Sequence, residues 1–406
     1  MRLAALDRLV TPARIRAYAV MFVLAYAVAV AAWGVSLNGG VDPSGRPAGS
    51  DFVTFYAAGG LALDGQAAAA YDEPTITGAE KDAVPGSDWV FLWHYPPSFQ
   101  LIVAPLAALP YGGALAVWLL LSGGLYLLMV RKLSGHPSAL LVGLAFPAVF
   151  INAMHGQNGF LNAALLGGGL LLLDRRPWLA GLLIGLLAYK PHFGVLLPFL
   201  LVAQGRWRTF ASAAVTSISL SAAAWLALGP EPWLAFVRNF GVVSQVLESR
   251  ALPWEKIPSV FVTVAGLGAP LPVAYAVHAA VALALAGLTV DAWRRPGSQA
   301  LKVALAIPAV LAVSPYCFDY DLVLLAIPIG LMAEHARSRP LPAGGKALLV
   351  LAFITPVLFT PFAKLTGVQL MPVPILLLFG LIWATLARER GAEDARPAVL
   401  PVATQA

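Results

Sequence analysis

Long, uniformly apolar runs are the feature of this chain that most constrains its fold. Each run is long enough, or nearly so, to cross a hydrocarbon layer of about 30 Å as an α-helix rising about 1.5 Å per residue. The clearest runs are Tyr18–Val35, Ala114–Val130, Phe160–Leu173, Val273–Val290 and Pro372–Leu386. Of the 406 residues, 59% are hydrophobic and 11% are charged, a composition that water could not cover. We therefore predict an all-α polytopic membrane protein, a bundle of about 12 transmembrane helices.

The composition also excludes other classes. A transmembrane β-barrel would alternate apolar with polar residues, and these Leu- and Ala-rich runs do not alternate. The net charge of +6 comes from short basic clusters between the apolar runs, so we expect no nucleic-acid partner. Cys317 is the single cysteine, which excludes an internal disulfide and a cluster of cysteine metal ligands.

The basic clusters predict the orientation in a plasma membrane of the bacterial inner-membrane type. Arginines precede the first run, and further clusters lie at 174–176, 206–208, 293–295 and 337–339. The positive-inside rule places all of them in the cytoplasm. The chain then divides into a cytoplasmic N-terminus (1–16), a membrane domain (17–387) and a disordered cytoplasmic tail (388–406). Within the membrane domain, 36–96 forms a long first external loop and 229–258 a second one.

Two local expectations concern the first half of the chain. Phe52–Leu63 has the pattern of a short amphipathic helix lying at the membrane surface. Three apolar segments follow, near 97–109, 112–130 and 139–152, although an even number of crossings is needed to keep His155 outside. We expect one of them to be re-entrant or to merge into a kinked helix, which is tolerated where it lines a cavity.

Polar residues at membrane edges are costly and are functional candidates by default, and here they gather on the external side. The first is Asp51, just beyond the first apolar run. In the simpler interpretation it is an N-cap that satisfies free N–H groups of the next helix. In the functional interpretation it is a general base that accepts a proton from an attacking hydroxyl.

Two further segments lie between apolar runs on the same side. His155, Gln157 and Asn158 add hydrogen-bonding groups where a plain turn would need little more than glycine. Lys190 and His192 flank Pro191, which breaks a helix and indicates a cavity wall. A lysine and a histidine there suit a phosphate, although Lys190 could simply extend to the lipid headgroups.

The last candidates come from the second half of the chain. Tyr316, Asp319 and Asp321 follow Ser314-Pro315, and the two carboxylates could bind a metal ion or sugar hydroxyls. Equally, Asp319 could cap a helix while Asp321 pairs with a cation. Arg250 and Lys256, in the second external loop, could assist in binding a phosphate.

Taken in order, these motifs resemble glycosyltransferase family 87, the DUF2029 group of polytopic GT-C enzymes. The resemblance spans about residues 17–335 and is carried by Ser50-Asp51-Phe52, Phe55-Tyr56-Ala57, Ala70-Tyr71-Asp72, Tyr95-Pro96-Pro97, Ala104-Pro105-Leu106, Leu109-Pro110, Gly156-Gln157-Asn158, Asp174–Gly181, Lys190-Pro191 and Ser314-Pro315. It implies a GT-C-like bundle that moves mannose from a polyprenyl-phosphate donor outside the cytoplasm, with Asp51 as the catalytic carboxylate. Many members have a histidine-rich segment after the Ser-Pro motif, where this chain has Asp319 and Asp321.

The resulting expectation is an inverting transfer to a glycolipid or glycan acceptor, because a single base suffices for direct displacement. His155, Gln157, Asn158, Lys190, His192, Tyr316, Asp319, Asp321 and Arg250 would bind the phosphate and sugar of the donor. No cofactor is required and no metal ligand is assigned, although a divalent cation at Asp319 and Asp321 is possible. The alternatives are a multispan transporter or lipid-linked sugar flippase, and a non-catalytic assembly protein.

Overall fold

The computed structural model describes residues 2–394, and this part of the chain is helical. It contains no β-sheet, only isolated bridges near Val41. The all-α prediction is therefore confirmed. Residues 395–406, most of the predicted tail, lie outside the described residues. The start of that tail was predicted wrongly, because the last helix continues through 388–394.

Between residues 2 and 394, six helices are long and apolar enough to cross a membrane singly. They are α2 (Pro12–Ser36), α6 (Tyr111–Leu133), α13 (Trp207–Leu228), α17 (Leu271–Arg294), α20 (Gly345–Thr366) and α21 (Pro372–Asp394). In the most hydropathic windows of α2 and α13, only 6% of residues are buried within the protein. Because such apolar surface is stable in hydrocarbon and not in water, these two helices indicate a multi-pass membrane protein.

The remaining membrane-like segments are short or broken. They are α7 (Ala139–Ala145), α8 (Pro147–His155), α9 (Gly159–Leu172), α10 (Pro177–Leu186), η3 (Leu187–Tyr189), α11 (Pro191–Gly194), α12 (Leu197–Ala203), α16 (Val260–Gly266), α18 (Gln299–Val313), η5 (Asp319–Leu325) and α19 (Ala326–Ser338). Proline begins several of them, since it lacks an amide donor and suits the first turn of a helix. The predicted count of about 12 transmembrane helices is thus supported in part, by six long helices among the described residues.

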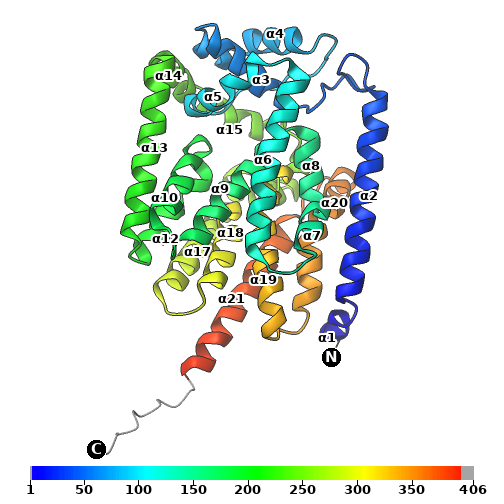
Figure 1. The fold of residues 1–406 in the computed structure, drawn as a ribbon, viewed down its shortest axis with the longest axis vertical. Coiled ribbons are helices and arrows are strands. Elements are labelled where there is room, and N and C mark those ends of the chain that lie inside the picture. Colours follow the sequence, from blue (N-terminus) through cyan, green and yellow to red (C-terminus); the bar gives the residue numbers. More distant parts are fainter. Residues whose placement is uncertain (1, 395–406) are drawn as a thin grey trace, which may run out of the picture.

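The segment 37–110, which we call the cap, folds over one end of the bundle (Figure 1). It contains α3 (Phe52–Leu63), η1 (Ala67–Tyr71), α4 (Glu73–Ala83), α5 (Pro97–Val103) and η2 (Ala104–Ala108). The predicted helix 52–63 is confirmed, but it is enclosed by the cap rather than amphipathic, and its place at the membrane surface stays a prediction. Phe52 and Phe55 are fully buried, because α4, α5 and η2 pack around α3.

The structure also shows how the three apolar segments between 97 and 152 fold. The first of its three apolar segments forms α5 and η2, which lie in the cap beside α3. The second is α6, and the third is α7 and α8, which meet at Phe146 before Pro147. The chain therefore makes two passes between the cap and His155. The first pass is α6, and the second is the kinked pair α7 and α8, so the required even number is met.

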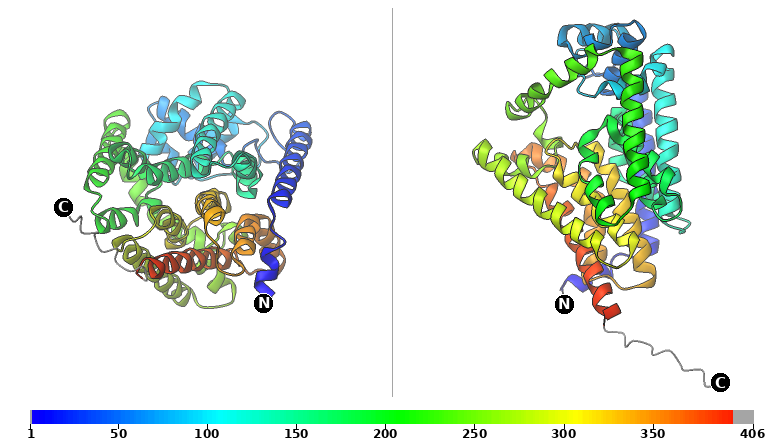
Figure 2. Two further views of the ribbon diagram at one scale, coloured as in Figure 1. Left: turned by 60° about the horizontal axis from the view of Figure 1, so that its bottom comes forward. Right: turned by 90° about the vertical axis from the view of Figure 1, so that its left-hand side faces the viewer.

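The second predicted loop, 229–258, also carries helices. They are α14 (Glu231–Arg238), α15 (Phe240–Glu248) and η4 (Trp254–Lys256). The helix α14 packs against η1 at the cap end, and the short α1 (Arg2–Asp7) lies at the other end with the far end of α21 (Figures 1 and 2). The two ends of the bundle are therefore distinct, and which of them faces the cytoplasm stays a prediction.

The buried core lies between the long helices, around α9, α18 and η5. In α18, every residue from Leu301 to Leu311 is buried, and in η5 all seven residues from Asp319 to Leu325 are. A helix that is apolar on all sides belongs in such a position. The chain between these two elements, together with the end of α8, brings polar residues from distant segments to the underside of the cap.

Candidate active site

Asp51 precedes α3 and lies where the cap meets the end of α8. Its side chain makes no capping hydrogen bond, so the simpler interpretation of Asp51 as an N-cap is wrong. Instead, Oδ2 accepts a hydrogen bond from Gln157 Nε2 at 3.0 Å, and Oδ1 lies 3.6 Å from His155 Nδ1. Burial would raise the pKa of Asp51, but attraction to His155 and the hydrogen bonds it accepts hold that pKa below its ordinary value. The side chain is therefore an ionised carboxylate at neutral pH.

His155 joins Asp51 to a lysine of the second loop. Its Nδ1 lies 2.8 Å from Ser50 Oγ, and its Nε2 lies 3.2 Å from Lys256 Nζ. A charged ammonium can only donate, so His155 Nε2 accepts from Lys256 in this arrangement, while Nδ1 faces Ser50 and Asp51. The side chains of Asp51 and His155 each keep 19% of their exposure, which leaves room for a substrate atom to reach them.

Gln157 holds the carboxylate in place. Its Oε1 accepts hydrogen bonds from the backbone N–H of Asn158 at 3.1 Å and from the Tyr95 hydroxyl at 3.3 Å. These two donors fix the orientation of the amide, so that Nε2 points at Asp51. Gln157 is 5% exposed and Asn158 is fully buried. Both therefore act as positioning groups around the carboxylate.

A second cluster lies deeper in the core and continues from Asn158. Lys190 Nζ lies 2.6 Å from Asp321 Oδ1 and donates to Asn158 Oδ1 at 3.1 Å. Asn162 donates to Asn158 Oδ1 and to Asp321 Oδ1, and it accepts from the Tyr189 hydroxyl. Asp51 and the Lys190-Pro191 break are thus joined through Gln157 and Asn158 in one hydrogen-bond network. The lysine charge, however, is matched by Asp321 and is 5% exposed at the side chain.

Glycines allow these segments to approach closely. Gly156 ends α8 with φ +59°, and a Cβ there would lie 2.6 Å from Phe52 Cβ. At Gly159, a Cβ would lie 2.5 Å from Asn152 Oδ1 and 2.6 Å from the Tyr320 carbonyl. Glycine is the one residue that meets both requirements without strain. The glycines that frame His155–Gly159 therefore bring α8, α3 and η5 together.

The two carboxylates after the Ser-Pro motif point to different clusters. Asp321 belongs to the Lys190 pair, whereas buried Asp319 has Lys256, His155 and Asp51 as its charged neighbours. The metal-like set that does form is His192, Cys317 and Asp321, whose ligand atoms lie within 4.8 Å of one another. Lys190 already neutralises Asp321, so this set fits a dication poorly. The possible cation between Asp319 and Asp321 is not supported by their placement.

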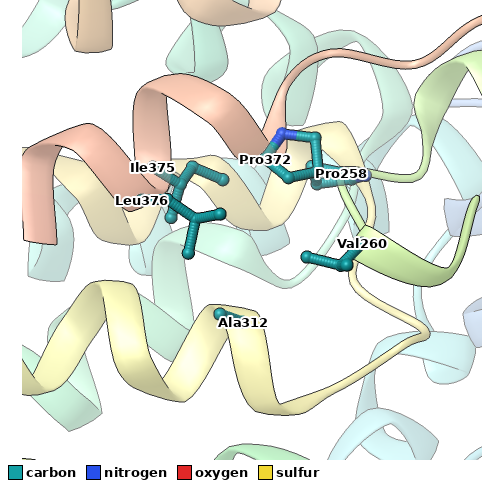
Figure 3. Close-up of a pocket in the computed structure, with 6 residues that line it drawn as sticks. All are labelled: Pro258, Val260, Ala312, Pro372, Ile375 and Leu376. Atoms are coloured by element: carbon teal, nitrogen blue, oxygen red, sulfur yellow. The ribbon is translucent and has the colours of Figure 1, made fainter. Parts of the chain in front are cut away.

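Two predicted residues lie apart from the clusters. Arg250 is exposed, has φ +61° and stacks on Trp254, with its guanidinium carbon 4.3 Å from the ring centroid. Tyr316 packs against the apolar cluster around Phe261. Within the described residues, neither forms a hydrogen bond or ion pair with Asp51, His155 or Lys190. A void of about 10 Å³ beside Val260 and Ala312 is apolar and too small for a sugar (Figure 3).

Three groups of the site were not singled out from the sequence. Ser50 and Tyr95 were noted only as parts of short motifs, and Lys256 only as one of several loop cations. Their contacts join segments about a hundred residues apart, such as His155 with Lys256. One feature of the sequence could have pointed to Tyr95. It precedes two prolines, which favour an extended chain, and a side chain on an extended segment is presented to its neighbours.

Comparison with known families shows which class of protein carries this cluster. The sequence matches the family model for glycosyltransferase family 87 over residues 93–315, more than half of the chain. The chain belongs to glycosyltransferase family 87. It is therefore an enzyme, a membrane glycosyltransferase, and the transporter and assembly-protein alternatives are set aside. No curated protein and no solved structure matches the chain.

The matched region includes most of the site but not all of it. His155–Asn158, Lys190 and Lys256 lie within 93–315, whereas Asp51 precedes this region and Asp319 and Asp321 follow it. These three acids are connected to the matched region by contacts in the structure. The geometry, rather than the family match, is thus the reason to include Asp51 in the candidate site.

Proposed function

We propose that this glycosyltransferase moves a hexose, with mannose as the first candidate, from a polyprenyl-phosphate donor to a glycolipid or glycan acceptor. The observation that carries the proposal is the ionised carboxylate of Asp51 held beside His155 and Lys256 under the cap. A base and a cationic group on one face of a partly open cluster are what transfer from a phosphate leaving group needs.

In the proposed reaction, Asp51 takes the proton of an acceptor hydroxyl. The acceptor oxygen forms a bond to the anomeric carbon as the bond from that carbon to the phosphate oxygen breaks. The electron pair leaves with the polyprenyl phosphate, and the configuration inverts. One carboxylate suffices, since a retaining route would require a second one as the nucleophile.

Lys256 is the group best suited to the departing phosphate. It lies at the cap end, is partly exposed and donates to His155, which itself faces Asp51. The sequence favoured Lys190 for this role, but Lys190 is buried and paired with Asp321. Lys190 then supports Asn158 and Gln157 from below, and Lys256 and His155 meet the phosphate.

The proposal includes a topology. The lipid tail of the donor stays in the bilayer, so the reacting centre must lie near a membrane edge. We place the cap outside the cytoplasm, and count twelve passes by adding the short helices α7–α8, α9, α10–η3, α11–α12, α18 and α19 to the six long ones.

The decisive experiment is transfer from labelled polyprenyl-phosphate mannose by the purified chain and its Asp51→Asn variant. We expect loss of transfer by about 100-fold or more, because the amide cannot accept the proton. Asp64→Asn is the matched control, an exposed acid at the other end of α3. Normal transfer by a folded Asp51→Asn variant would refute the mechanism.

The same assay tests the proposed role of Lys256. For Lys256→Ala we expect the KM for the donor to rise about 10-fold or more, since a charge-assisted hydrogen bond is lost. Lys81→Ala, an exposed cap lysine, serves as its control. An unchanged donor KM in Lys256→Ala would remove this residue from the phosphate site.

A further inference from the structure

A larger cavity lies in the cap region, apart from the Asp51 cluster. Its volume is about 130 Å³, and it lies between η1 and α4 of the cap and the segment that joins α14 to α15. The elements that bound it are at the cap end of the bundle (Figure 1). An engineered cavity of about 150 Å³ holds a benzene molecule, so this partly open cavity accepts the ring of one sugar only if some of its hydroxyl groups extend through the opening.

The lining combines aromatic surface with neutral polar groups. Tyr71 and Trp93 supply rings, while His94 and Asn239 supply ring and amide polar atoms. Burial lowers the pKa of His94 to about 4, so its imidazole is neutral at physiological pH. The lining includes Glu73 and neither lysine nor arginine, so it disfavours an anion. Aromatic faces with planar neutral polar groups suit the C–H and O–H groups of a sugar ring.

Two polar side chains of this lining, Trp93 and Asn239, have atoms that make no hydrogen bond within the described residues. The Trp93 indole N–H is buried and has no hydrogen-bond partner. Asn239 donates to the Trp93 carbonyl at 3.2 Å, and its amide nitrogen lies 3.5 Å from His94 Nδ1. These contacts hold the amide against the cavity wall and use its nitrogen, while its oxygen makes no hydrogen bond within the described residues. A ligand hydroxyl would replace water as the donor to this oxygen.

The cavity is connected to the proposed base by a short chain of contacts. The rings of Trp93 and Tyr95 have centroids 5.3 Å apart, and the Tyr71 hydroxyl donates to the Tyr95 carbonyl at 2.7 Å. The Tyr95 hydroxyl in turn donates to Gln157, which donates to Asp51. A ring in the cavity would thus lie on the Tyr95 side of Asp51, away from Lys256 and the proposed phosphate position.

We propose that this cavity is a subsite for a pyranose ring of the acceptor, a ring that does not itself react. The inference rests on the proposed transfer reaction for its role, but the sugar site can be tested without turnover. Asn239 and His94 hold the hydroxyls, and Trp93 and Tyr71 contact the ring. The acceptor then carries at least two sugar rings, one beside Asp51 and one here.

Binding of methyl α-D-mannopyranoside to the purified full chain, measured by saturation-transfer NMR, decides the assignment. We expect binding that weakens about five-fold or more in Asn239→Ala, which loses a hydrogen-bonding amide, and in Trp93→Phe, which loses part of the aromatic surface that lines the cavity. Asn38→Ala and Trp89→Phe, both exposed and away from the cavity, should bind normally. Thermal unfolding verifies that each variant is folded. Absent binding, or binding that the Asn239 and Trp93 variants do not change, would overturn the subsite.

Kinetics with octyl mannoside and its disaccharide homologue then test the role in transfer. We expect the second ring to lower the acceptor KM in the wild type and in Trp89→Phe, but not in Asn239→Ala, with donor KM unchanged. The same free saccharides without the octyl chain distinguish a lipid-linked from a soluble acceptor. If the Asn239 and Trp93 variants weaken sugar binding but neither the wild type nor any variant transfers sugar, the transfer reaction alone would be refuted. Transfer with an acceptor KM that is independent of Asn239 would refute the subsite alone.

Discussion

Lys190 and Asp321 show how the surroundings of a residue determine its role. Each charge is removed from solvent, with side chains 5% and 1% exposed, and their nearest atoms are 2.6 Å apart. Removing one member of such a pair leaves an uncompensated charge, whereas replacing both with apolar groups can be neutral. From sequence alone, Lys190→Ala would weaken donor use with little change in expression. The buried pair changes that expectation to a loss of folded protein.

We predict that Lys190→Met lowers the free energy of unfolding by about 3–5 kcal/mol, because Asp321 is left without its cation. The double variant Lys190→Met with Asp321→Leu should recover most of that loss. Detergent-based thermal unfolding of the two variants and the wild type is the measurement. A stable single variant would show that the pair does not hold the core together.

Glu80 in the cap supplies a prediction about pH. It is 1% exposed and accepts a hydrogen bond from the Phe91 N–H at 3.0 Å. Burial raises its pKa from the ordinary 4.5 to about 7. The pKa of Glu80 is higher in the folded state than in the unfolded state. The contribution of Glu80 to the free energy of unfolding is therefore complete below pH 4.5 and is lost as the pH rises through about 7. Unfolding temperatures should fall between about pH 5 and pH 8, and Glu80→Gln should flatten that slope. Asp82→Asn, an exposed neighbour, should leave the slope unchanged.

At the scale of elements, the site depends on where α8 stops. Gly156 ends α8 in a left-handed conformation and passes against Phe52 at the start of α3. His155 and Gln157, on either side of it, are therefore presented to Asp51 from one turn. The approach of α8 to α3 is what converts two separate polar motifs into one cluster.

We predict that Gly156→Ala destabilises the protein by about 2 kcal/mol or more, because both the backbone conformation and the contact with Phe52 disfavour a Cβ. Transfer should fall with it. Gly78→Ala in α4, where a Cβ would meet nothing within 4 Å, should be neutral or slightly stabilising. Unfolding and transfer assays on the pair of variants separate the two cases, and equal behaviour would contradict the role given to Gly156.

Sequence patterns predicted the helical class, the helix 52–63 and the acids and amides that form the site. They could not predict which partner each residue meets. Asp51 lies 106 residues from Gln157, and Lys190 lies 131 residues from Asp321. Residue type is a local property, whereas pairing depends on how α8, η4 and η5 pack. Arg250 is an example: it stacks on Trp254, a contact that its residue type did not predict.

For the whole molecule, the separation of the cap from the opposite end makes the orientation testable. Native Cys317 is fully buried, so an introduced cysteine would be the reactive one. An impermeant maleimide should label Asp64→Cys in the cap of intact cells. Arg175→Cys, beyond the far end of α9, should be labelled only after the membrane is opened. The reverse pattern would place the cap in the cytoplasm and exclude an external reaction.

The ion pair of the core also has a consequence for biogenesis. A ribosome reaches Lys190 well before Asp321, 131 residues later, so the lysine emerges with no carboxylate to match it. The site can be completed only after the α18–η5 segment has been synthesised and inserted. A chain that stops short of that point would retain an uncompensated charge in its core, so we expect it not to reach the folded state.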